Sequence, residues 1–525
     1  MLTDRISKIA ILALIVVYLG VRLWRLTDSC LWFDEIFSVH AAEHDWSSLF
    51  FFVSQDLIHP PLFYVLLKIW IAIGGESLFW LRLLPVLLSA LALVPFIYLC
   101  RDLKLKTPVT LLSLAFIAVN GSLIKYAQEV RMYSLLLLMS LLSMWLFARY
   151  FSRGKSFASL VIVNVLLVYT HYFGWLVVGT EVAAILVFQR IKWLRITAMT
   201  GMVLASFVPW LIAVWRAASG GAELSQNIGW MTRPGLRELR TFALDLIEPF
   251  YFQASSVEPP AIYFVSVPIM LICLTAVTIY LINWKREDEK RTTCVLALFA
   301  LVPLVFVFAA SWLLPQSIWG TRHLIIVFAP IFLLISLSVS KIAINALRYA
   351  AYSAITIFIF AGFINYARTP SSTFIWCSWE PLAKQWIKAP HYSSQPKKLY
   401  VFEDLAAYHF WFATRHFPNY RIELVKGIEG LPNDPAYFLP RGFTDISVRD
   451  LLPTEGDEFW LSFREVSGPP PVGEHERSTR PFEVPVTHFE NLGYTVEDVK
   501  KQVDGTQTAY LIKMSRGSAG ASPSS

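Results

Sequence analysis

The stretch 79–100, FWLRLLPVLLSALALVPFIYLC, contains twenty-two residues and a single charged side chain, Arg82. A helix needs about twenty apolar residues to cross the hydrocarbon core of a membrane, so this stretch predicts a membrane span. Comparable runs recur along the chain, and 56% of its 525 residues are hydrophobic. Soluble domains are only about 45–50% apolar. The sequence therefore predicts an α-helical polytopic membrane protein.

The apolar runs also define a topology. They lie at residues 7–25, 61–74, 79–100, 108–123, 132–151, 157–170, 174–189, 196–216, 261–283, 293–314, 323–340 and 347–366. The run 61–74 is too short to span and carries Lys68, so we place it in or near the membrane interface. The remaining eleven spans put the basic residues of every short loop on one side, which the positive-inside rule makes cytoplasmic. We expect an inner (plasma) membrane protein with its N-terminus inside and its C-terminal domain outside.

The net charge of +7 resides largely in these short loops, which disfavours nucleic-acid binding. Residues 1–367 form the predicted transmembrane domain, with 27–78 as its first outer loop. The chain then becomes polar, and residues 368–514 predict a small extracytoplasmic α/β domain. Its strands are expected at Leu399–Glu403, Arg421–Lys426, Glu458–Glu465 and Ala509–Met514, with a helix at Asp404–His416. A tail at 515–525, rich in Ser, Gly and Ala, is predicted to be disordered.

The five cysteines show no metal-binding spacing. Cys30 and Cys377 would both lie outside, but the sequence does not decide whether they pair. His40-Ala41-Ala42-Glu43-His44 matches the H-x-x-E-H pattern of some zinc peptidases, although no third ligand is evident. We interpret that segment as an ordinary amphipathic helix and predict no metal ligands, while a divalent metal as cofactor stays open.

Polar residues that suit chemistry collect on the predicted outer face. Asp34 and Glu35 are adjacent, so in a helix they would point about 100° apart and serve two different roles. One carboxylate can act as general base on an acceptor hydroxyl, and the other can bind a substrate group. The deep interiors of the spans, in contrast, are nearly free of charge. Ionisable groups gathered at one end favour a catalytic site there over a pathway through the membrane.

Two arginines suit a phosphate group. Arg131 and Arg322 each offer a planar fork of donors at the outer end of a span, although either could instead snorkel or pair with an acid. Glu129 could be the structural partner of Arg131, and His59 could simply belong to a rigid turn before Pro60. The candidate substrate-binding residues are His59, Gln128, Glu129, Arg131, Tyr133, His171, Tyr172 and Arg322. The pair His171-Tyr172 could also be only an interfacial anchor.

Absent motifs restrict the donor. The sequence has neither a P-loop nor a D-x-D motif, and its inner loops are too short for a nucleotide-sugar-binding domain. A soluble nucleotide-sugar donor is therefore disfavoured. A lipid phosphate sugar would be dissolved in the membrane and would explain a catalytic site at its edge.

The ordered motifs resemble the bacterial family 39 glycosyltransferases, which are related to protein O-mannosyltransferases and to the aminoarabinose transferase of lipid A. The similar stretches are Leu31–Ser38, His59–Leu67, Leu81–Pro85, Tyr126–Tyr133 and Tyr169–Gly174, in family order over about a third of the chain. The resemblance implies the GT-C fold and inverting transfer from a polyprenyl-phosphate sugar. It places Asp34 at the position of the base, Glu35 beside it, and Gln128–Arg131 near the donor phosphate. Arg82-Leu83-Leu84-Pro85 departs in spacing from the commoner R-L-P-S, so we treat Arg82 as structural.

The sequence thus predicts a glycosyltransferase that uses a polyprenyl-monophosphate sugar, with Asp34 and Glu35 as catalytic residues. The alternative is a transporter or flippase for lipid-linked glycans that performs no chemistry. The sugar, the acceptor (protein, lipid or glycan), the carrier length and the oligomeric state are not specified by the sequence.

Overall fold

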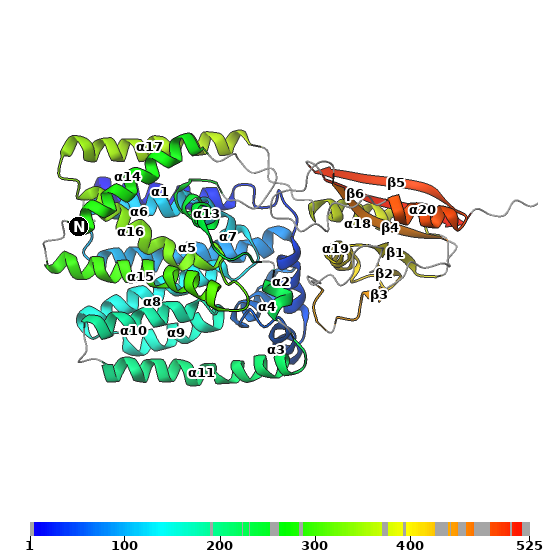
Figure 1. The fold of residues 1–525 in the computed structure, drawn as a ribbon, viewed down its shortest axis with the longest axis horizontal. Helices are drawn as coiled ribbons and strands as arrows, with labels where there is room; N and C mark the ends of the chain where they lie inside the picture. Colours follow the sequence, from blue (N-terminus) through cyan, green and yellow to red (C-terminus); the bar gives the residue numbers. More distant parts are fainter. Residues whose placement is uncertain are drawn as a thin grey trace, which may run out of the picture. The chain divides into compact units, whose positions relative to one another are not determined.

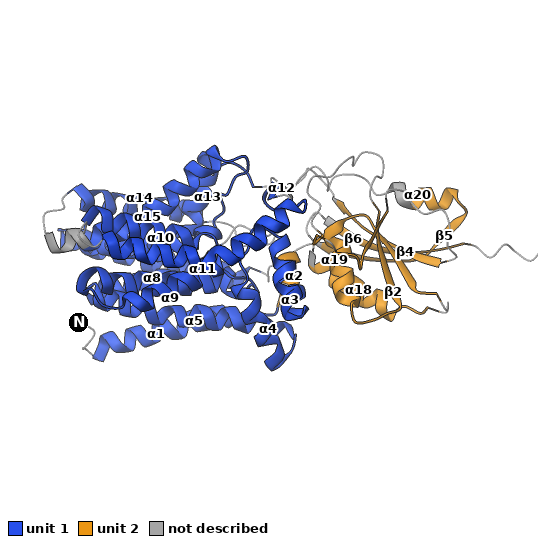
Figure 2. Ribbon diagram, turned by 90° about the horizontal axis from the view of Figure 1, so that it is seen from below, with its two compact units in different colours: residues 1–27, 38–254, 258–370 blue, residues 28–37, 255–257, 371–525 orange. Residues whose placement is uncertain are grey.

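The computed structural model forms two compact units, which are described separately (Figures 1 and 2). Unit 1 comprises most of residues 1–370, and unit 2 comprises residues 28–37 together with the chain from Ser371 onward. The structure describes residues 5–188, 193–222, 224–229, 231–251, 262–282, 287–369, 376–391, 395–425, 439–441, 443–449, 458–466, 483–504 and 507–516.

Unit 1 is a bundle of apolar helices that run side by side (Figure 1). Within the described ranges, eight are long and apolar enough to cross a membrane. They are α1 (Arg5–Leu23), α5 (Leu78–Asp102), α8 (Tyr133–Arg153), α11 (Trp193–Ser219), α14 (Tyr263–Ile282), α15 (Glu287–Leu313), the 3-10 turn η2 (His323–Val327) continued by α16 (Phe328–Ser340), and α17 (Asn345–Arg368). Each of these helices begins within six residues of the start of a predicted apolar run. The chain is a multi-pass membrane protein.

Four shorter apolar helices complete the predicted set, namely α4 (Leu62–Gly74), α6 (Thr107–Val119), α9 (Phe157–Thr170) and α10 (Gly174–Phe188). Length alone does not separate α4 from the other three. Its contacts do, because Lys68 in the middle of α4 donates to the carbonyl oxygens of Ala42 (3.2 Å) and His44. These carbonyls lie at the C-terminal end of α2 (Phe33–Glu43), which is one of the helices of the first loop. Together with α3 (Trp46–Gln55), α4 lies at one end of the bundle (Figure 1), and its interfacial position stays a prediction.

Arg22 fixes the first span against the helix that leads to the Tyr126–Tyr133 stretch. Its guanidinium is fully buried and donates to the carbonyl oxygens of Ile117 (3.1 Å) and Ala118 (3.0 Å). The last carbonyls of a helix carry partial negative charge and lack partners within the helix, so a cation stabilises the end of α6. Asn120 then starts α7 (Gly121–Gln128), because its side chain accepts the backbone N–H of Leu123 at 3.0 Å.

Glycine is required at the first residue of α7. A Cβ on Gly121 would lie 1.9 Å from the carbonyl oxygen of Tyr251, which is far inside van der Waals contact. The backbone of 249–251 therefore presses directly on this turn, and Phe250 donates its N–H to the carbonyl oxygen of Val119 at 2.8 Å. This close approach helps to fix where the chain emerges toward Arg131.

Unit 2 contains a six-stranded mixed sheet in the order β3-β2-β1-β4-β6-β5. The strands are β1 (Lys397–Val401), β2 (Tyr420–Val425), β3 (Ser447–Arg449), β4 (Glu458–Val466), β5 (Tyr494–Asp504) and β6 (Gln507–Arg516), and the helices are α18 (Trp376–Lys388), α19 (Asp404–Thr414) and α20 (Glu483–Asn491). The first four strands in this order are parallel, whereas β6 and β5 are antiparallel to their neighbours. The small α/β domain predicted from the sequence is therefore confirmed.

Both faces of the central strand β1 are covered. Leu399 and Val401 belong to one buried cluster with residues of α18 and α19, and Tyr400 belongs to a second cluster with Phe489 of α20. This alternation follows from the two-residue period of a strand. The sequence did not predict the edge strand β5. Its Tyr494 is buried in the second cluster, whereas Val499 and Val503 further along the strand are exposed. The predicted tail begins two residues too early, since β6 continues through Arg516, and residues 517–525 lie outside the described part of the chain.

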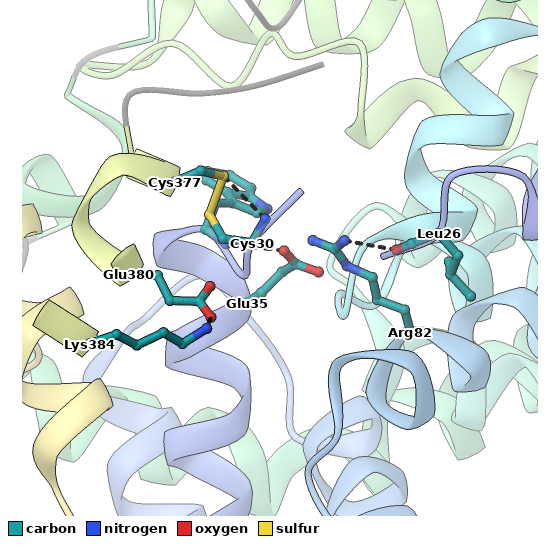
Figure 3. The surroundings of a disulfide bond; sticks show 8 residues. Leu26, Cys30, Glu35, Arg82, Cys377, Glu380 and Lys384 are labelled. Carbon is teal, nitrogen blue, oxygen red and sulfur yellow. Dashed lines mark hydrogen bonds and ion pairs between the residues drawn. A yellow bond between two sulfur atoms is a disulfide. The ribbon is translucent and has the colours of Figure 1, made fainter. Parts of the chain in front are cut away.

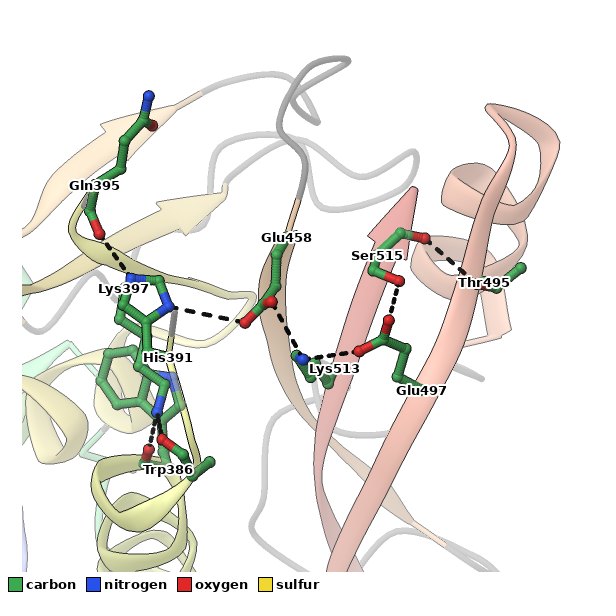
Figure 4. A network of polar contacts seen from close by, with 10 residues as sticks. Trp386, His391, Gln395, Lys397, Glu458, Thr495, Glu497, Lys513 and Ser515 are labelled. Atoms are coloured by element: carbon green, nitrogen blue, oxygen red, sulfur yellow. Dashed lines mark hydrogen bonds and ion pairs between the residues drawn. The ribbon is translucent and has the colours of Figure 1, made fainter. Parts of the chain in front are cut away.

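A network of polar contacts closes the end of the sheet where β1 and β4 begin (Figure 4). Lys397 is buried and donates to the carbonyl oxygens of Trp386 and, at 2.7 Å, of Ala389, which end α18. Burial lowers the pKa of Lys397 to about 8, while nearby Glu458 opposes this shift. Glu458 in turn pairs with Lys513 of β6 at 3.2 Å. The network joins α18, β1, β4 and β6 into one body.

Unit 2 also includes residues 28–37, which lie near the N-terminus of the chain. Ile36 is part of its main apolar core, and Leu31, Phe33 and Phe37 pack against that core. A disulfide links Cys30 to Cys377, across 347 positions of sequence (Figure 3). The pairing that the sequence left undecided is therefore present. Residues 28–37 thus belong to the same compact unit as the C-terminal domain.

Candidate functional site

The centre of the candidate site in unit 1 is Arg131, in the turn between α7 and α8. Its side chain is buried, with only 2% of the residue exposed. One terminal nitrogen, Nη1, donates to Ser38 Oγ at 3.3 Å and to Tyr64 Oη at 3.4 Å. The other, Nη2, lies 3.2 Å from His59 Nε2. Groups from α2, α4 and the turn before α4 thus hold the guanidinium in one orientation.

The orientation of His59 is set by Asp56, which ends α3. The two side chains form a short hydrogen bond between Nδ1 and Oδ2. A guanidinium can only donate, so His59 Nε2 must accept from Arg131 and the imidazole proton must lie on Nδ1, facing the carboxylate. Sequence analysis did not identify Asp56. The sequence feature that could have identified it is its position three residues before His59, which was already a candidate.

Two further histidines lie beside this group. The ring centroid of His171 is 6.0 Å from that of His59 and 5.2 Å from that of His323. His171 occupies the turn between α9 and α10, where its Nδ1 accepts the backbone N–H of Phe173 at 3.1 Å. His323 begins η2, and its ring lies 6.4 Å from that of Tyr133. His323 was not singled out from the sequence, although it directly follows Arg322.

This cluster is buried and lies close to two guanidiniums. Burial holds the pKa of His171 well below its usual value, and the nearby guanidiniums of Arg131 and Arg322 lower it further. The His171 imidazole is therefore uncharged at neutral pH. Positive charge at this position comes from two guanidiniums, which stay protonated at all relevant pH values. A phosphate group placed here would find fixed cationic donors.

The other candidates from the sequence make side-chain contacts of their own. Gln128 donates to the carbonyl oxygens of Arg22 (3.0 Å) and Trp24 (2.8 Å) at the end of α1. Glu129 lies 3.8 Å from Lys125, and the Tyr172 hydroxyl accepts the indole N–H of Trp210 at 3.1 Å. The structure thus brings His59, Arg131 and His171 together. Tyr133 joins this group indirectly, because its ring lies near that of His323.

Asp34 and Glu35 lie in the first turn of α2, within unit 2. The helix that was assumed for residues 32–38 is present, so the two carboxylates leave α2 in different directions. Glu35 is fully buried, and one carboxylate oxygen accepts the backbone N–H of Trp32 at 3.1 Å. Asp34 is partly buried. It precedes Ser38 by four residues, and such residues share one face of a helix.

Glu181 is an acidic residue inside one of the predicted spans. It lies in α10, fully buried, with Oε1 2.6 Å from Ser143 Oγ and Oε2 2.7 Å from Asn164 Nδ2. Ser143 and Asn164 also contact each other at 2.6 Å. Helices α8, α9 and α10 each supply one member, so the triad ties three helices together. A lone acid in the run 174–189 was the available signal.

The two histidines of the H-x-x-E-H segment make packing contacts and a local hydrogen bond. The rings of His40 and His44 lie 4.8 and 4.5 Å from that of Phe52. His44 Nδ1 donates to the carbonyl oxygen of His40 at 2.8 Å, within its own helix turn. The predicted helix is present, but His40, Ala41 and Ala42 are all buried, so the segment is not the solvated amphipathic helix that was expected.

Comparisons with known proteins support the fold. No family model and no curated protein matches the chain. Among solved structures, ArnT from Cupriavidus metallidurans bound to undecaprenyl phosphate matches with a TM-score of 0.56 and 12% identity, over 98% of this chain and 99% of that one. Its apo structure matches with a TM-score of 0.52 and 12% identity, over 96% and 97%. The oligosaccharyltransferase of Archaeoglobus fulgidus gives 0.48 and 12%, covering 79% of this chain, which spans 64% of that one. The chain has the GT-C fold.

Proposed function

We propose that this protein is a membrane glycosyltransferase that moves a sugar from a polyprenyl-monophosphate carrier to an acceptor, with inversion at the anomeric carbon. The observation that carries the proposal is the buried guanidinium of Arg131, oriented by Ser38, Tyr64 and His59. A rigid fork of donors suits a phosphate oxygen better than a flexible surface cation does. The likeness to ArnT, whose structure holds undecaprenyl phosphate, supports the same class of lipid donor.

The residues have complementary roles in this proposal. The acceptor oxygen forms a new bond to the anomeric carbon of the sugar while Asp34 removes its proton. The bond between that carbon and the phosphate oxygen breaks, and its electron pair leaves with the polyprenyl phosphate. Arg131 and Arg322 stabilise the charge of the phosphate, so the leaving group needs no acid. Glu35 helps to hold a substrate group beside the base.

The first loop and the C-terminal domain would then lie on the outer face of the inner membrane, as the basic loops predict. The resemblance to family 39 stays a prediction, and so do the roles of Gln128, Glu129, Tyr133, His171 and Tyr172 in binding the donor. A divalent metal is not required for the steps above. The transporter alternative predicts binding of the same donor without its consumption.

The decisive test is transfer of labelled sugar from a panel of polyprenyl-monophosphate sugars to native envelope extract, with the purified full-length protein. Wild type should release free polyprenyl phosphate, and Asp34→Asn should lower turnover by about 10²- to 10⁴-fold, the usual contribution of a general base. Asp498→Asn, a carboxylate on the edge strand β5, is the matched control and should keep wild-type turnover. If Asp34→Asn kept half or more of the wild-type activity, the assignment of Asp34 as the general base would be refuted. Binding of a donor that is never consumed would favour the transporter.

A further inference from the structure

The C-terminal domain holds the beginning of the helix that carries the proposed base. Residues 28–37 are separated from Ser371 in the sequence by all the candidate spans that follow α1, yet they belong to unit 2. Ile36 is 2% exposed and lies in one buried cluster with Trp379, Leu382 and Tyr408. The ring of Phe33 packs on that of Tyr408 at 5.2 Å between centroids. Asp34 therefore stands between two apolar side chains that are anchored in this domain.

Covalent and polar contacts add to the apolar anchors. The Cys30–Cys377 disulfide joins the segment that precedes α2 to the first turn of α18. The backbone N–H of Cys30 also lies 3.1 Å from Cys377 Sγ. Within the turn itself, Glu35 accepts the N–H of Trp32, and Trp32 accepts the N–H groups of Glu35 (2.9 Å) and Ile36 (3.0 Å). Figure 3 shows Glu35 near this disulfide. The first turn of α2 is thus closed and attached on both sides.

We propose that the C-terminal domain is a clamp that positions Asp34 for catalysis, and that Cys30, Cys377, Phe33 and Ile36 are its positioning residues. This inference rests on the proposed role of Asp34. A base must be held close to its productive geometry, because a misplacement of about 1 Å can reduce the rate by about 10²-fold. A short helix start in a loop has no such rigidity alone. Its packing into a folded domain and a disulfide supply it.

The clamp makes two demands on the protein. The C-terminal domain, although last in the sequence, must fold before the first outer loop reaches its active arrangement. The disulfide must also form, which suits an oxidising compartment such as the periplasm. A domain that only recognised the acceptor would not need the segment around Asp34 in its own core.

The test compares kinetics and local opening in the full-length protein. Cys30→Ser/Cys377→Ser should lower kcat by about 10- to 100-fold, as expected for a displaced base, while the KM for the donor stays within about two-fold. Ile36→Ala should act in the same direction, and Ile36→Val should restore most of the turnover. Cys294→Ser, which changes a cysteine outside the disulfide, is the matched control and should leave kcat unchanged.

Hydrogen exchange of the peptide 28–37, followed by mass spectrometry, makes the result independent of turnover. Faster exchange of this peptide in the Cys30→Ser/Cys377→Ser protein, with exchange in α8 unchanged, supports the clamp. Unchanged exchange together with unchanged kcat would overturn it, and so would an effect confined to the KM for the acceptor. If wild type transfers no sugar but the peptide still opens in the variant, the disulfide does anchor residues 28–37, while the proposed function, and with it the role of Asp34 as a base, fails. The two failures are therefore distinguishable.

Discussion

Arg131 Nη2 lies 3.2 Å from His59 Nε2, and the opposite nitrogen of the same imidazole is bonded to Asp56. The carboxylate holds the proton on Nδ1, so the nitrogen that faces the guanidinium is an acceptor. Arg131 is thereby oriented through a relay that starts at the end of α3. A buried cation held in this way does not need to reorganise when an anion binds, which is the condition for effective electrostatic stabilisation.

Arg131→Lys should impair use of the donor. A lysine keeps the charge but has neither the planar fork nor the reach to contact Ser38, Tyr64 and His59 together. We expect the KM for the polyprenyl-phosphate donor to rise by about ten-fold or more, corresponding to the loss of roughly one charge-assisted hydrogen bond. Titration with labelled donor measures this change. Arg153→Lys is the control, since Arg153 contacts Asp102 at 3.4 Å near the end of α8, and normal kinetics are expected.

Asp56→Asn tests the relay itself. The amide can donate to His59 Nδ1, which would move the imidazole proton to Nε2 and set two donors against each other at Arg131. A donor facing a donor costs about 1–3 kcal/mol, so donor affinity should fall by roughly 5- to 100-fold while the protein remains folded. Isothermal titration with a polyprenyl phosphate gives the affinity. An affinity equal to that of wild type would show that the tautomer of His59 has no influence on Arg131.

Glu181 should matter for stability and little for chemistry. Replacement by leucine removes two interhelical hydrogen bonds and leaves Ser143 and Asn164 facing an apolar side chain. Interhelical hydrogen bonds in membranes contribute about 1–2 kcal/mol at most, so the apparent melting temperature in detergent should fall by several degrees. Glu181→Gln retains polar atoms at both positions and should lose less. A large loss of turnover with an unchanged melting temperature would instead assign Glu181 a direct role.

The C-terminal domain should become less stable in acid because of His409. Burial lowers the pKa of His409 from 6.5 to about 3, so the folded domain keeps it neutral while the unfolded chain takes up a proton below pH 6.5. The free energy of unfolding therefore decreases as the pH falls from 6.5 toward 3, by about 1.4 kcal/mol per pH unit. Thermal melts of wild type and His409→Phe between pH 7 and 4.5 measure the difference. The variant should lose this dependence, whereas His416→Gln, at an exposed position, should retain it.

Much of the architecture was predictable because it depends on local composition. Within the described residues, the apolar runs matched the helices closely, since a membrane requires long apolar segments whatever their neighbours are. The strands β1, β2, β4 and β6 were also recognised. The strand β5 and the helix α18 were not, because their side chains acquire a buried face only when β6 or the sheet is in place. Sequence reasoning likewise found His59 and Arg131 but missed Asp56, although its partner His59 is only three residues away. It also missed Glu181, whose partners come from other helices.

The sequence by itself determined that the chain crosses a membrane many times, that an α/β domain follows, and that arginine and histidine candidates for an anion site recur near span ends. These properties follow from run length, composition and order. Only the tertiary structure decided that Arg131 meets Ser38, Tyr64 and His59, and that Cys30 pairs with Cys377. Both depend on contacts between segments far apart in the chain, where chain entropy permits many pairings and only complete packing selects one.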